Sequence, residues 1–185
     1  MRDGPPIYTI GHSTRTILEF TDLLRCGEVE LVVDVRTVPR SRRNPQYNED
    51  VLEGELAPFQ IEYRRIAGLG GLRGRSPDIP REVNGFWDNQ SFHNYADYAL
   101  SSQFKSALED LLRIASSRRL AIMCSEAVWW RCHRRIIADY LIARGLVVLH
   151  LMGRDRVEPA SLTTAATIEG DEIVYPRGTP LSDQP

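Results

Sequence analysis

The sequence is poor in several features that mark particular classes of protein. Among its 185 residues there are only three cysteines and a single lysine, Lys105. No apolar run approaches the roughly 18 residues of a membrane-spanning helix. The first residues show no apolar stretch followed by a small-residue cleavage site. Because few cysteines fit a reducing compartment, these absences predict a soluble cytoplasmic protein with no membrane partner and no signal for secretion.

Positive charge comes almost entirely from arginine, and it is unevenly distributed. The formal net charge of -2 predicts no overall attraction to nucleic acid. However, nine arginines lie from Arg36 to Arg81, against seven acidic residues from Asp34 to Asp78. The planar guanidinium group suits phosphate, although the amino-acid usage of a GC-rich genome would produce the same bias.

The apolar pattern predicts a single α/β domain, because a chain of this length suits one hydrophobic core. Short β-prone runs alternate with segments whose apolar residues recur at helical spacing. This alternation is typical of a mostly parallel sheet, here of about five strands, joined by right-handed βαβ crossovers. We expect strands at residues 7–10, 31–35, 61–66, 120–124 and 146–152. We expect helices at residues 16–26 with Thr14 as the cap, before Phe59, at residues 95–116, and after Cys132 as far as Gly145.

Two further segments complete the predicted organisation. The glycine- and proline-rich residues 68–93 form a long irregular excursion, and such loops are usually lids or binding surfaces. We assign residues 1–155 to an α/β catalytic domain and residues 156–185 to a C-terminal extension. This extension contains one β arm, at residues 172–175, and a polar, proline-bearing end that is predicted to be mobile.

Polar residues follow the ends of four predicted strands. In an open parallel sheet, ligands bind beyond the carboxyl ends of the strands, where loops converge and helix N-termini present free N–H groups. We therefore expect these residues to line one crevice. They are His12 and Ser13 after the first strand, Asp34 and Arg36 after the second, Gly70 and Gly71 after the third, and Cys124, Glu126, Cys132, His133 and Arg134 around the fourth.

The two carboxylates, Asp34 and Glu126, allow a structural and a catalytic interpretation. In the structural one, Asp34 pairs with Arg36 or a neighbouring arginine, and Glu126 caps the helix that contains His133. In the catalytic one, a carboxylate orients or deprotonates water while a histidine or arginine stabilises charge on the departing group. An unpaired charge would be costly at either strand end, so each carboxylate should have a partner.

Cys124, Cys132 and His133 are residue types that bind zinc or take part in nucleophilic catalysis. Their spacing lacks the paired CxxC or HxxxH elements of common zinc sites, so we expect no metal and no cofactor. Cys132 precedes a predicted helix and lies beside arginines, which would lower its pKa and favour a nucleophilic thiolate. A thiol-dependent transferase therefore stays open, although the glycine- and arginine-rich cradle of rhodanese and tyrosine-phosphatase loops is absent.

Tryptophans lie in two of the predicted loops. Trp129 and Trp130 precede Cys132, and Trp87 lies in the long excursion. At a binding site, such rings would stack on a planar group such as a base. Ordinary packing is the alternative for each, and at least one of the adjacent pair is expected to be buried.

Several segments together resemble a known family. They are YTIGHSTRT, LVVDVRTVPRSRRNPQYN, the LGG of residues 69–71, YADYALSSQF and AIMCSEAVWWRCHRRIIADYLIARG, and the tail TTAATIEGDEIVYP also looks like the family's ending. In order and spacing, from about Tyr8 to Leu151, the series resembles the family described as domain of unknown function 488 (DUF488). Most members have no assigned reaction, but some resemble DNA glycosylases that act on modified pyrimidines. The family's recurrent polar positions match His12, Ser13, Asp34, Arg36, Cys124, Glu126, Cys132, His133 and Arg134.

The resemblance implies an enzyme of DNA repair. We expect a monofunctional DNA glycosylase that excises a modified pyrimidine, such as 5-hydroxymethyluracil, by hydrolysing the N-glycosidic bond. Asp34 or Glu126 would stabilise the oxocarbenium-like sugar and position water, while His12, Arg36 or His133 would donate to the leaving base. A lyase step usually needs an amine, and the only lysine lies on a predicted surface helix.

The remaining candidate residues are expected to bind substrate or DNA. The expected partner is DNA with a modified base, and no protein partner is evident. Two alternatives stay open, namely a hydrolase or transferase of a free nucleotide or nucleoside, and a non-catalytic module that senses nucleotides. The substrate-binding candidates are Ser13, Gly70, Gly71, Cys124, Trp129, Trp130, Cys132 and Arg134, and the DNA-binding candidates are Arg40, Arg42, Arg43, Arg73, Arg75 and Trp87.

Overall fold

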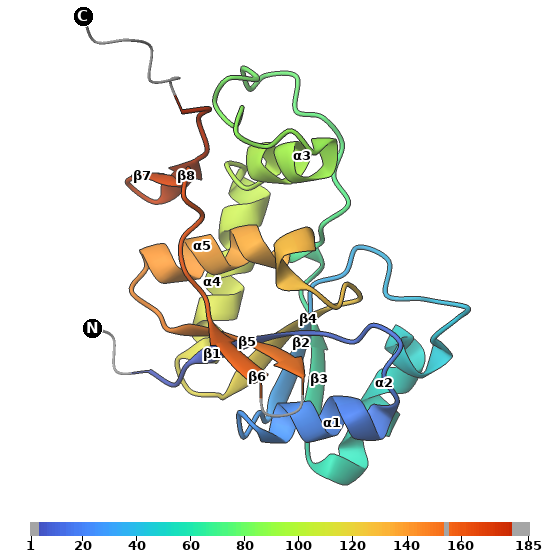
Figure 1. The fold of residues 1–185 in the computed structure, drawn as a ribbon. Helices are drawn as coiled ribbons and strands as arrows, with labels where there is room; N and C mark the ends of the chain where they lie inside the picture. The colour runs from blue at the N-terminus through green and yellow to red at the C-terminus, as the bar shows by residue number, and fades with distance from the viewer. Residues whose placement is uncertain (1–3, 154–155, 179–185) are drawn as a thin grey trace, which may run out of the picture.

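The computed structural model describes residues 4–153 and 156–178, and within them a six-stranded sheet forms the centre of the molecule (Figure 1). The strand order is β3-β2-β4-β1-β5-β6. The first five strands are parallel, and β6 pairs with β5 in the antiparallel sense. The expected α/β class with a mostly parallel sheet is confirmed. The strands are β1 (Ile7–Gly11), β2 (Leu31–Asp34), β3 (Glu62–Arg65), β4 (Leu120–Cys124), β5 (Val148–Gly153) and β6 (Arg156–Pro159).

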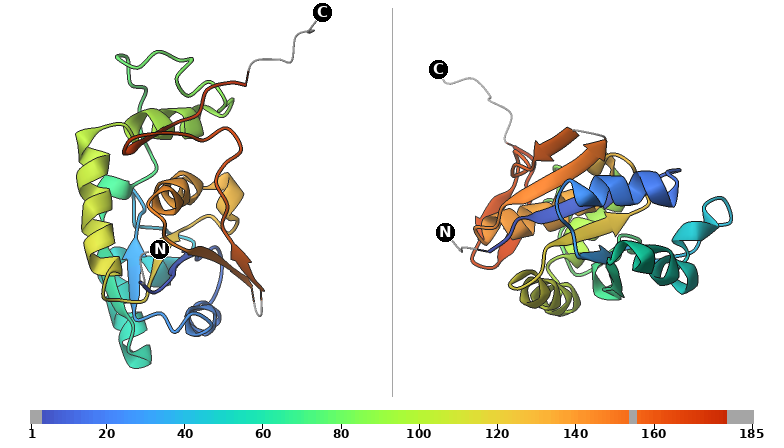
Figure 2. Two further views of the ribbon diagram at one scale, coloured as in Figure 1. Left: turned by 90° about the vertical axis from the view of Figure 1, so that its left-hand side faces the viewer. Right: turned by 90° about the horizontal axis from the view of Figure 1, so that it is seen from below.

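Helices cover both faces of the sheet, which explains why β2 and β4 are buried along their whole length (Figure 2). On one face, Val32 and Met123 pack with residues of α1 and α2. On the other, Val33 and Ile122 pack with residues of α3, α4 and α5. Among the described residues, no helix has the length and apolar content needed to cross a membrane. The helices are α1 (Ile17–Arg25), α2 (Glu49–Leu56), α3 (Gln90–Tyr98), α4 (Ser102–Ala115) and α5 (Arg134–Ala143).

The expected helix at residues 95–116 is wrong, because the chain forms two helices there. The helix α3 begins earlier, where the Asn89 side chain accepts from the N–H groups of Ser91 and Phe92. It ends before Ser101, whose hydroxyl caps α4 by accepting from the N–H of Phe104. A serine cap of this kind favours the start of a new helix. The helical spacing of apolar residues continues across the junction, so the sequence pattern does not show the break between the two helices.

The C-terminal part of the chain continues the same core. The strand β6 extends the main sheet, and it has little apolar signal because it is a largely exposed edge strand. The expected β arm is β8 (Glu172–Val174), which pairs with β7 (Thr167–Glu169). Ile173 and Tyr175 are buried in the core beneath α5. Residues 179–185, which include the end that was expected to be mobile, lie outside the described residues.

The cap of α1 is Thr16 and not Thr14. The Thr16 hydroxyl accepts from the N–H of Glu19, and the Glu19 carboxylate accepts from the Thr16 N–H in return. This reciprocal pair is a capping box. Both threonines precede the apolar stripe, but only Thr16 has a glutamate three residues further on.

We expect Thr16→Ala to lower the free energy of unfolding by about 1 kcal/mol, because it leaves a helix N–H without its acceptor. Thr14→Ala is the matched control and should change stability by no more than about 0.5 kcal/mol. Urea denaturation followed by circular dichroism measures both. Equal losses in the two variants would contradict the assignment of the cap.

Candidate functional site

A pocket of about 510 Å³ opens at the carboxyl ends of the parallel strands. Its size falls in the range of small-molecule sites. It is built from the loops that follow β1, β2 and β4, from the start of the long excursion, and from the residue before α5. The lining residues are His12, Ser13, Thr14, Arg36, Thr37, Val38, Arg40, Ser41, Asn44, Gly71, Leu72, Cys124, Ser125 and His133.

The charged side chains in this lining are all of one sign. It contains two arginines, two histidines, several hydroxyl groups and a thiol, but no carboxylate side chain among the described residues. Guanidinium groups bind phosphate and carboxylate groups through charge-assisted hydrogen bonds. The pocket therefore suits a ligand that carries negative charge.

Asp34 and Arg36 form a buried ion pair at the base of the pocket. Arg36 Nη2 lies 2.6 Å from Asp34 Oδ2, and Arg36 Nε lies 2.9 Å from Asp34 Oδ1. The Tyr63 hydroxyl donates to Asp34 Oδ2 at 2.7 Å. Burial alone would lower the pKa of Arg36, but Asp34 outweighs it and raises that pKa. The structural interpretation of Asp34 is confirmed: its carboxylate is 0% exposed and orients Arg36, which reaches the pocket.

His12 is a neutral imidazole with a defined tautomer. Its Nδ1 lies 2.8 Å from the carbonyl oxygen of Ser13, so Nδ1 carries the proton and donates it. Its Nε2 lies 3.2 Å from Arg36 Nη1 and accepts from that group. The ring stacks on Tyr47 with centroids 4.1 Å apart. Burial lowers the pKa of His12 to about 4, so the ring is uncharged at neutral pH.

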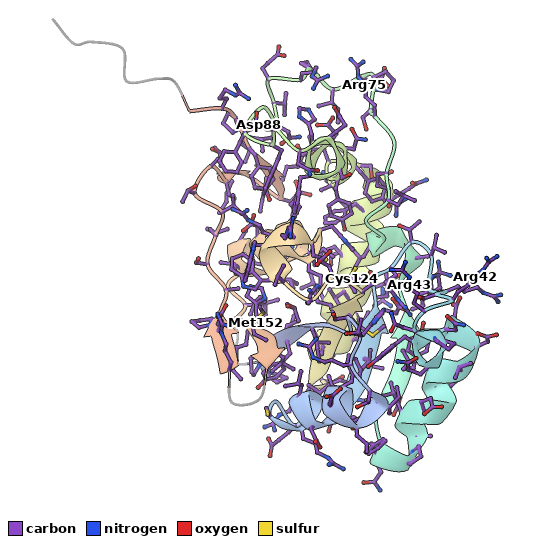
Figure 3. All side chains as sticks on the ribbon, turned by 45° about the vertical axis from the view of Figure 1, so that its right-hand side comes forward. Arg42, Arg43, Arg75, Asp88, Cys124 and Met152 are labelled. Atoms are coloured by element: carbon purple, nitrogen blue, oxygen red, sulfur yellow. The ribbon has the colours of Figure 1, made fainter. Side chains whose placement is uncertain are left out.

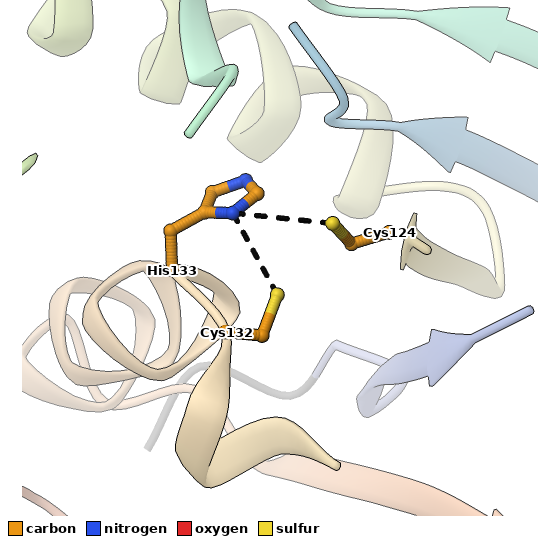
Figure 4. A group of neighbouring side chains, drawn as sticks. All are labelled: Cys124, Cys132 and His133. Atoms are coloured by element: carbon orange, nitrogen blue, oxygen red, sulfur yellow. Dashed lines mark hydrogen bonds between the residues drawn. The ribbon is translucent and has the colours of Figure 1, made fainter. Parts of the chain in front are cut away.

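Cys124, Cys132 and His133 come together beside the pocket (Figure 4). His133 Nδ1 lies 3.6 Å from Cys132 Sγ and 4.0 Å from Cys124 Sγ. His133 Nε2 donates to the carbonyl oxygen of Val35 at 2.9 Å. A Cβ atom at Gly71 would lie 2.3 Å from His133 Nδ1, so only glycine fits against this ring. The three side chains offer one thiol or imidazole ligand atom each, all within 4.8 Å of one another.

The two thiols differ in their ionisation. Burial would raise the pKa of Cys132, but a hydrogen bond from Cys124 and the charge of Arg134 outweigh it and lower this pKa to about 6. The hydrogen bond to Cys132, together with burial, raises the pKa of Cys124 to about 12. The pair therefore holds one negative charge, on Cys132, and the pocket-lining thiol of Cys124 keeps its proton.

Arg134 is a buried cation that supports this charge. It is 1% exposed and donates from Nε to Cys132 Sγ at 3.3 Å and from Nη2 to the carbonyl oxygen of Glu126 at 2.6 Å. Among the described residues, no carboxylate lies within ion-pair distance of it. Arg134 is therefore placed to stabilise the thiolate of Cys132 and does not line the pocket.

Glu126 fits neither interpretation of its carboxylate. Its side chain is exposed and is not part of the pocket lining. It does not cap α5 either, because His133 holds the N-cap position and no side chain bonds the free N–H groups there. The loop after β4 points the Glu126 carboxylate toward solvent, and it is the backbone carbonyl of Glu126 that accepts from Arg134.

The tryptophans lie outside the pocket. Trp129 stacks on His150 with centroids 4.5 Å apart and donates from Nε1 to Glu158. Trp130 is 43% exposed and is absent from the lining. Trp87 is buried, and its neighbours are aromatic. None of the three rings lines the pocket, and the expected contacts of Trp129 and Trp130 with substrate and of Trp87 with DNA stay predictions. The aromatic neighbours of Trp87 are Phe86, Phe92 and Tyr175.

The arginines expected to bind DNA divide into two groups. Arg40 lines the pocket, and Arg42 and Arg43 project into solvent from the same loop (Figure 3). Arg75 lies on the long excursion, well apart from Cys124 in the same view. Arg73 stacks over the Tyr98 ring and donates from Nε to the carbonyl oxygen of Gly70. Of these five arginines, only Arg40 lines the pocket, and Arg42 and Arg43 share its loop.

Sequence reasoning missed Tyr47 and Tyr63, which support His12 and Asp34. It also missed five polar residues that line the pocket. Three of them share the loop after β2 with Arg36 and Arg40, so membership of a strand-end loop was the available signal. The five residues are Thr14, Thr37, Ser41, Asn44 and Ser125.

Comparison with known proteins gives one result. Residues 16–141 match the model of the family described as domain of unknown function DUF488, and this stretch covers more than half of the 185 residues. Searches of curated proteins and of solved structures returned no match. The matched stretch contains the loop after β2 and the cluster of Cys124, Cys132 and His133. The chain therefore belongs to the DUF488 family.

Proposed function

We propose that the protein is a DNA glycosylase that excises a modified pyrimidine by hydrolysing its N-glycosidic bond. The observation that carries this proposal is the pocket itself, whose lining within the described part of the chain has arginines and no carboxylate. Arg42 and Arg43 are exposed on the loop that supplies the lining residue Arg40. A flipped nucleotide needs a site for its base and cationic groups for the flanking phosphates. The pocket and its loop can provide both.

In this mechanism Arg36 stabilises the leaving base. When the N-glycosidic bond breaks, the electron pair moves to the pyrimidine, and a fixed cation beside it lowers the barrier. The anionic base then takes up the proton that the attacking water loses as it adds to the sugar. Asp34 holds the guanidinium in place because both of its carboxylate oxygens accept hydrogen bonds from Arg36. Asp34 therefore acts as a positioning residue, and the ion pair is preorganised before the substrate arrives.

Water and the sugar cation need other partners, because neither Asp34 nor Glu126 lines the pocket. The Ser13 hydroxyl offers an acceptor that orients a water molecule, whereas both ring nitrogens of His12 are already used, Nδ1 by the Ser13 carbonyl and Nε2 by Arg36. The phosphates of the DNA carry the negative charge that stabilises the oxocarbenium-like sugar. This division of roles replaces the carboxylate mechanism expected from the sequence.

The test is incubation of the protein with a panel of duplexes, each with one modified pyrimidine, followed by mass spectrometry of released bases. We expect base release from at least one duplex, and a loss of about 10²–10³-fold in rate with Arg36→Lys. Arg118→Lys is the matched control. Arg118 precedes β4 and pairs with Glu62 at the start of β3, so this ion pair lies at the amino-terminal ends of the strands, away from the pocket. Release of no base from any duplex, or release only from free nucleosides, would contradict the proposal.

A further inference from the structure

We propose that Cys124, Cys132 and His133 bind a zinc ion whose fourth ligand position faces the pocket. The spacing of these residues along the chain argued against a metal, since it matches no common zinc motif. The fold removes this objection, because the loop after β4 returns Cys132 and His133 to the end of the strand that carries Cys124 (Figure 4). Zinc binding does not depend on the substrate proposed above.

The distances between the ligand atoms fit a tetrahedral ion. With Zn–S of about 2.3 Å and Zn–N of about 2.0 Å, a sulfur and a nitrogen ligand at the tetrahedral angle lie ~3.5 Å apart. The two observed separations are 3.6 Å, from Cys132 Sγ to His133 Nδ1, and 4.0 Å, from Cys124 Sγ to the same nitrogen. An ion between the three atoms therefore needs only small side-chain adjustments.

The imidazole of His133 is oriented as a metal ligand. Its Nε2–H donates to the carbonyl oxygen of Val35, which leaves the lone pair of Nδ1 directed at both sulfurs. Metal-binding histidines are usually fixed in this way by a hydrogen bond from the other ring nitrogen. The Tyr95 ring packs against the imidazole with centroids 4.9 Å apart, and the absence of a side chain at Gly71 gives the ring its space.

The surroundings of the sulfurs also suit a metal-bound thiolate. Arg134 Nε donates to Cys132 Sγ at 3.3 Å, and the rest of this guanidinium is held by Thr9 and the backbone of Glu126. Hydrogen bonds to a ligating sulfur are the second-shell contacts that tune a metal site. Two thiolates and a neutral imidazole select zinc over hard cations such as magnesium.

The site resembles a catalytic zinc centre more than a structural one, because it has three protein ligands. Structural zinc sites are almost always closed by four protein ligands, whereas catalytic sites leave one position for water or substrate. Cys124 and His133 both line the pocket, and Cys132 lies behind them. The open position therefore faces the pocket, where Ser125, whose Oγ lies 4.0 Å from Cys124 Sγ, is a neighbouring lining residue.

The test uses the whole wild-type protein, reduced, freed of metal with a chelator and then titrated with Co²⁺ or Zn²⁺. We expect one Co²⁺ per chain, with the thiolate-to-cobalt charge-transfer absorption of a tetrahedral site, and displacement by one Zn²⁺. A thiol reagent should modify three cysteines in the metal-free protein under mild denaturation and only the exposed Cys26 once zinc is bound. The charge-transfer absorption should be lost in Cys124→Ala, Cys132→Ala and His133→Ala and kept in the matched control Cys26→Ala.

A second pair of variants tests the geometry without removing a ligand. Gly71→Ala pushes the His133 ring aside and should weaken Zn²⁺ binding at least 10-fold. Gly74→Ala is the control on the same segment, since a Cβ there meets no atom within 4 Å. Circular dichroism establishes that each variant is folded.

Three results would overturn the proposal. The first is wild-type protein that binds neither Co²⁺ nor Zn²⁺. The second is an unchanged count of three reactive thiols when zinc is present. The third is a Cys124–Cys132 disulfide that forms in air as fast with zinc present as without it, which would show that zinc does not hold the two thiolates. The wild-type titration decides the question even if a cysteine variant fails to fold.

Discussion

Asp34→Ala should lower the free energy of unfolding by about 3–5 kcal/mol, because it leaves the guanidinium of Arg36 buried without its counter-charge. Arg36 is 5% exposed, and Asp34 accepts hydrogen bonds from its Nε and Nη2 atoms and from its backbone N–H. The Tyr63 hydroxyl would lose its acceptor as well. Urea denaturation of the wild-type and variant proteins measures the difference.

The exposed pair of Asp110 and Arg113 is the matched control for this experiment. Asp110→Ala removes the same kind of contact, at 2.7 Å, from the surface of α4 and should change stability little. Adding Arg36→Met to Asp34→Ala should restore part of the loss, because it removes the unpaired charge. A loss in Asp34→Ala no larger than in Asp110→Ala would contradict the assignment of a buried, coupled ion pair.

Stability should also fall as the pH drops from about 6.5 to about 4, because two buried histidines resist protonation. Burial lowers the pKa of both His12 and His150 from 6.5 to about 4. The unfolded chain therefore binds protons in this window that the folded chain does not bind. Each neutral histidine therefore keeps its full contribution to the free energy of unfolding above pH 6.5, the pKa in the unfolded chain. As the pH falls from there to about 4, the free energy of unfolding drops by on the order of 3 kcal/mol for each histidine.

Urea denaturation at a series of pH values from about 7 to about 4 measures this dependence. His12→Asn and His150→Gln should each remove part of the slope, and the double variant should remove most of it. His150 accepts or donates one hydrogen bond with Thr9 at 2.8 Å, which glutamine can replace. Equal stability of the wild-type protein at the two ends of the range would contradict the prediction.

The sheet and the position of the site were predictable because strands buried on both faces show a clear apolar pattern in the sequence. The runs at Leu31–Asp34 and Leu120–Cys124 are buried on both faces, so nearly every residue in them is apolar. The carboxyl ends of parallel strands meet at one edge. Polar residues directly after the strands, such as His12 and Arg36, were therefore predicted at one place, and they do share a pocket.

The direction of side chains in the loops was not predictable from the apolar pattern of the sequence. Glu126 and Cys124 are two residues apart, yet one faces solvent and the other lines the pocket. The proximity of Cys124 and His133 depends on the path of the connection before α5, and no spacing rule describes that path. Trp129 packs on His150, a residue of a different strand, and only the tertiary structure brings these rings together.

The place of β1 in the sheet has a consequence for folding. Among the strands that the structure describes, β1 is made first, but its two neighbours are β4 and β5, which lie more than a hundred residues later in the chain. One edge of β1 stays unpaired until β4 has been made, and the other stays unpaired until residue 148 and its successors have been made. Contacts of such high sequence separation slow folding, and exposed strand edges attract other chains during synthesis. Chains truncated before β5 would therefore leave one edge of β1 unpaired and tend to aggregate.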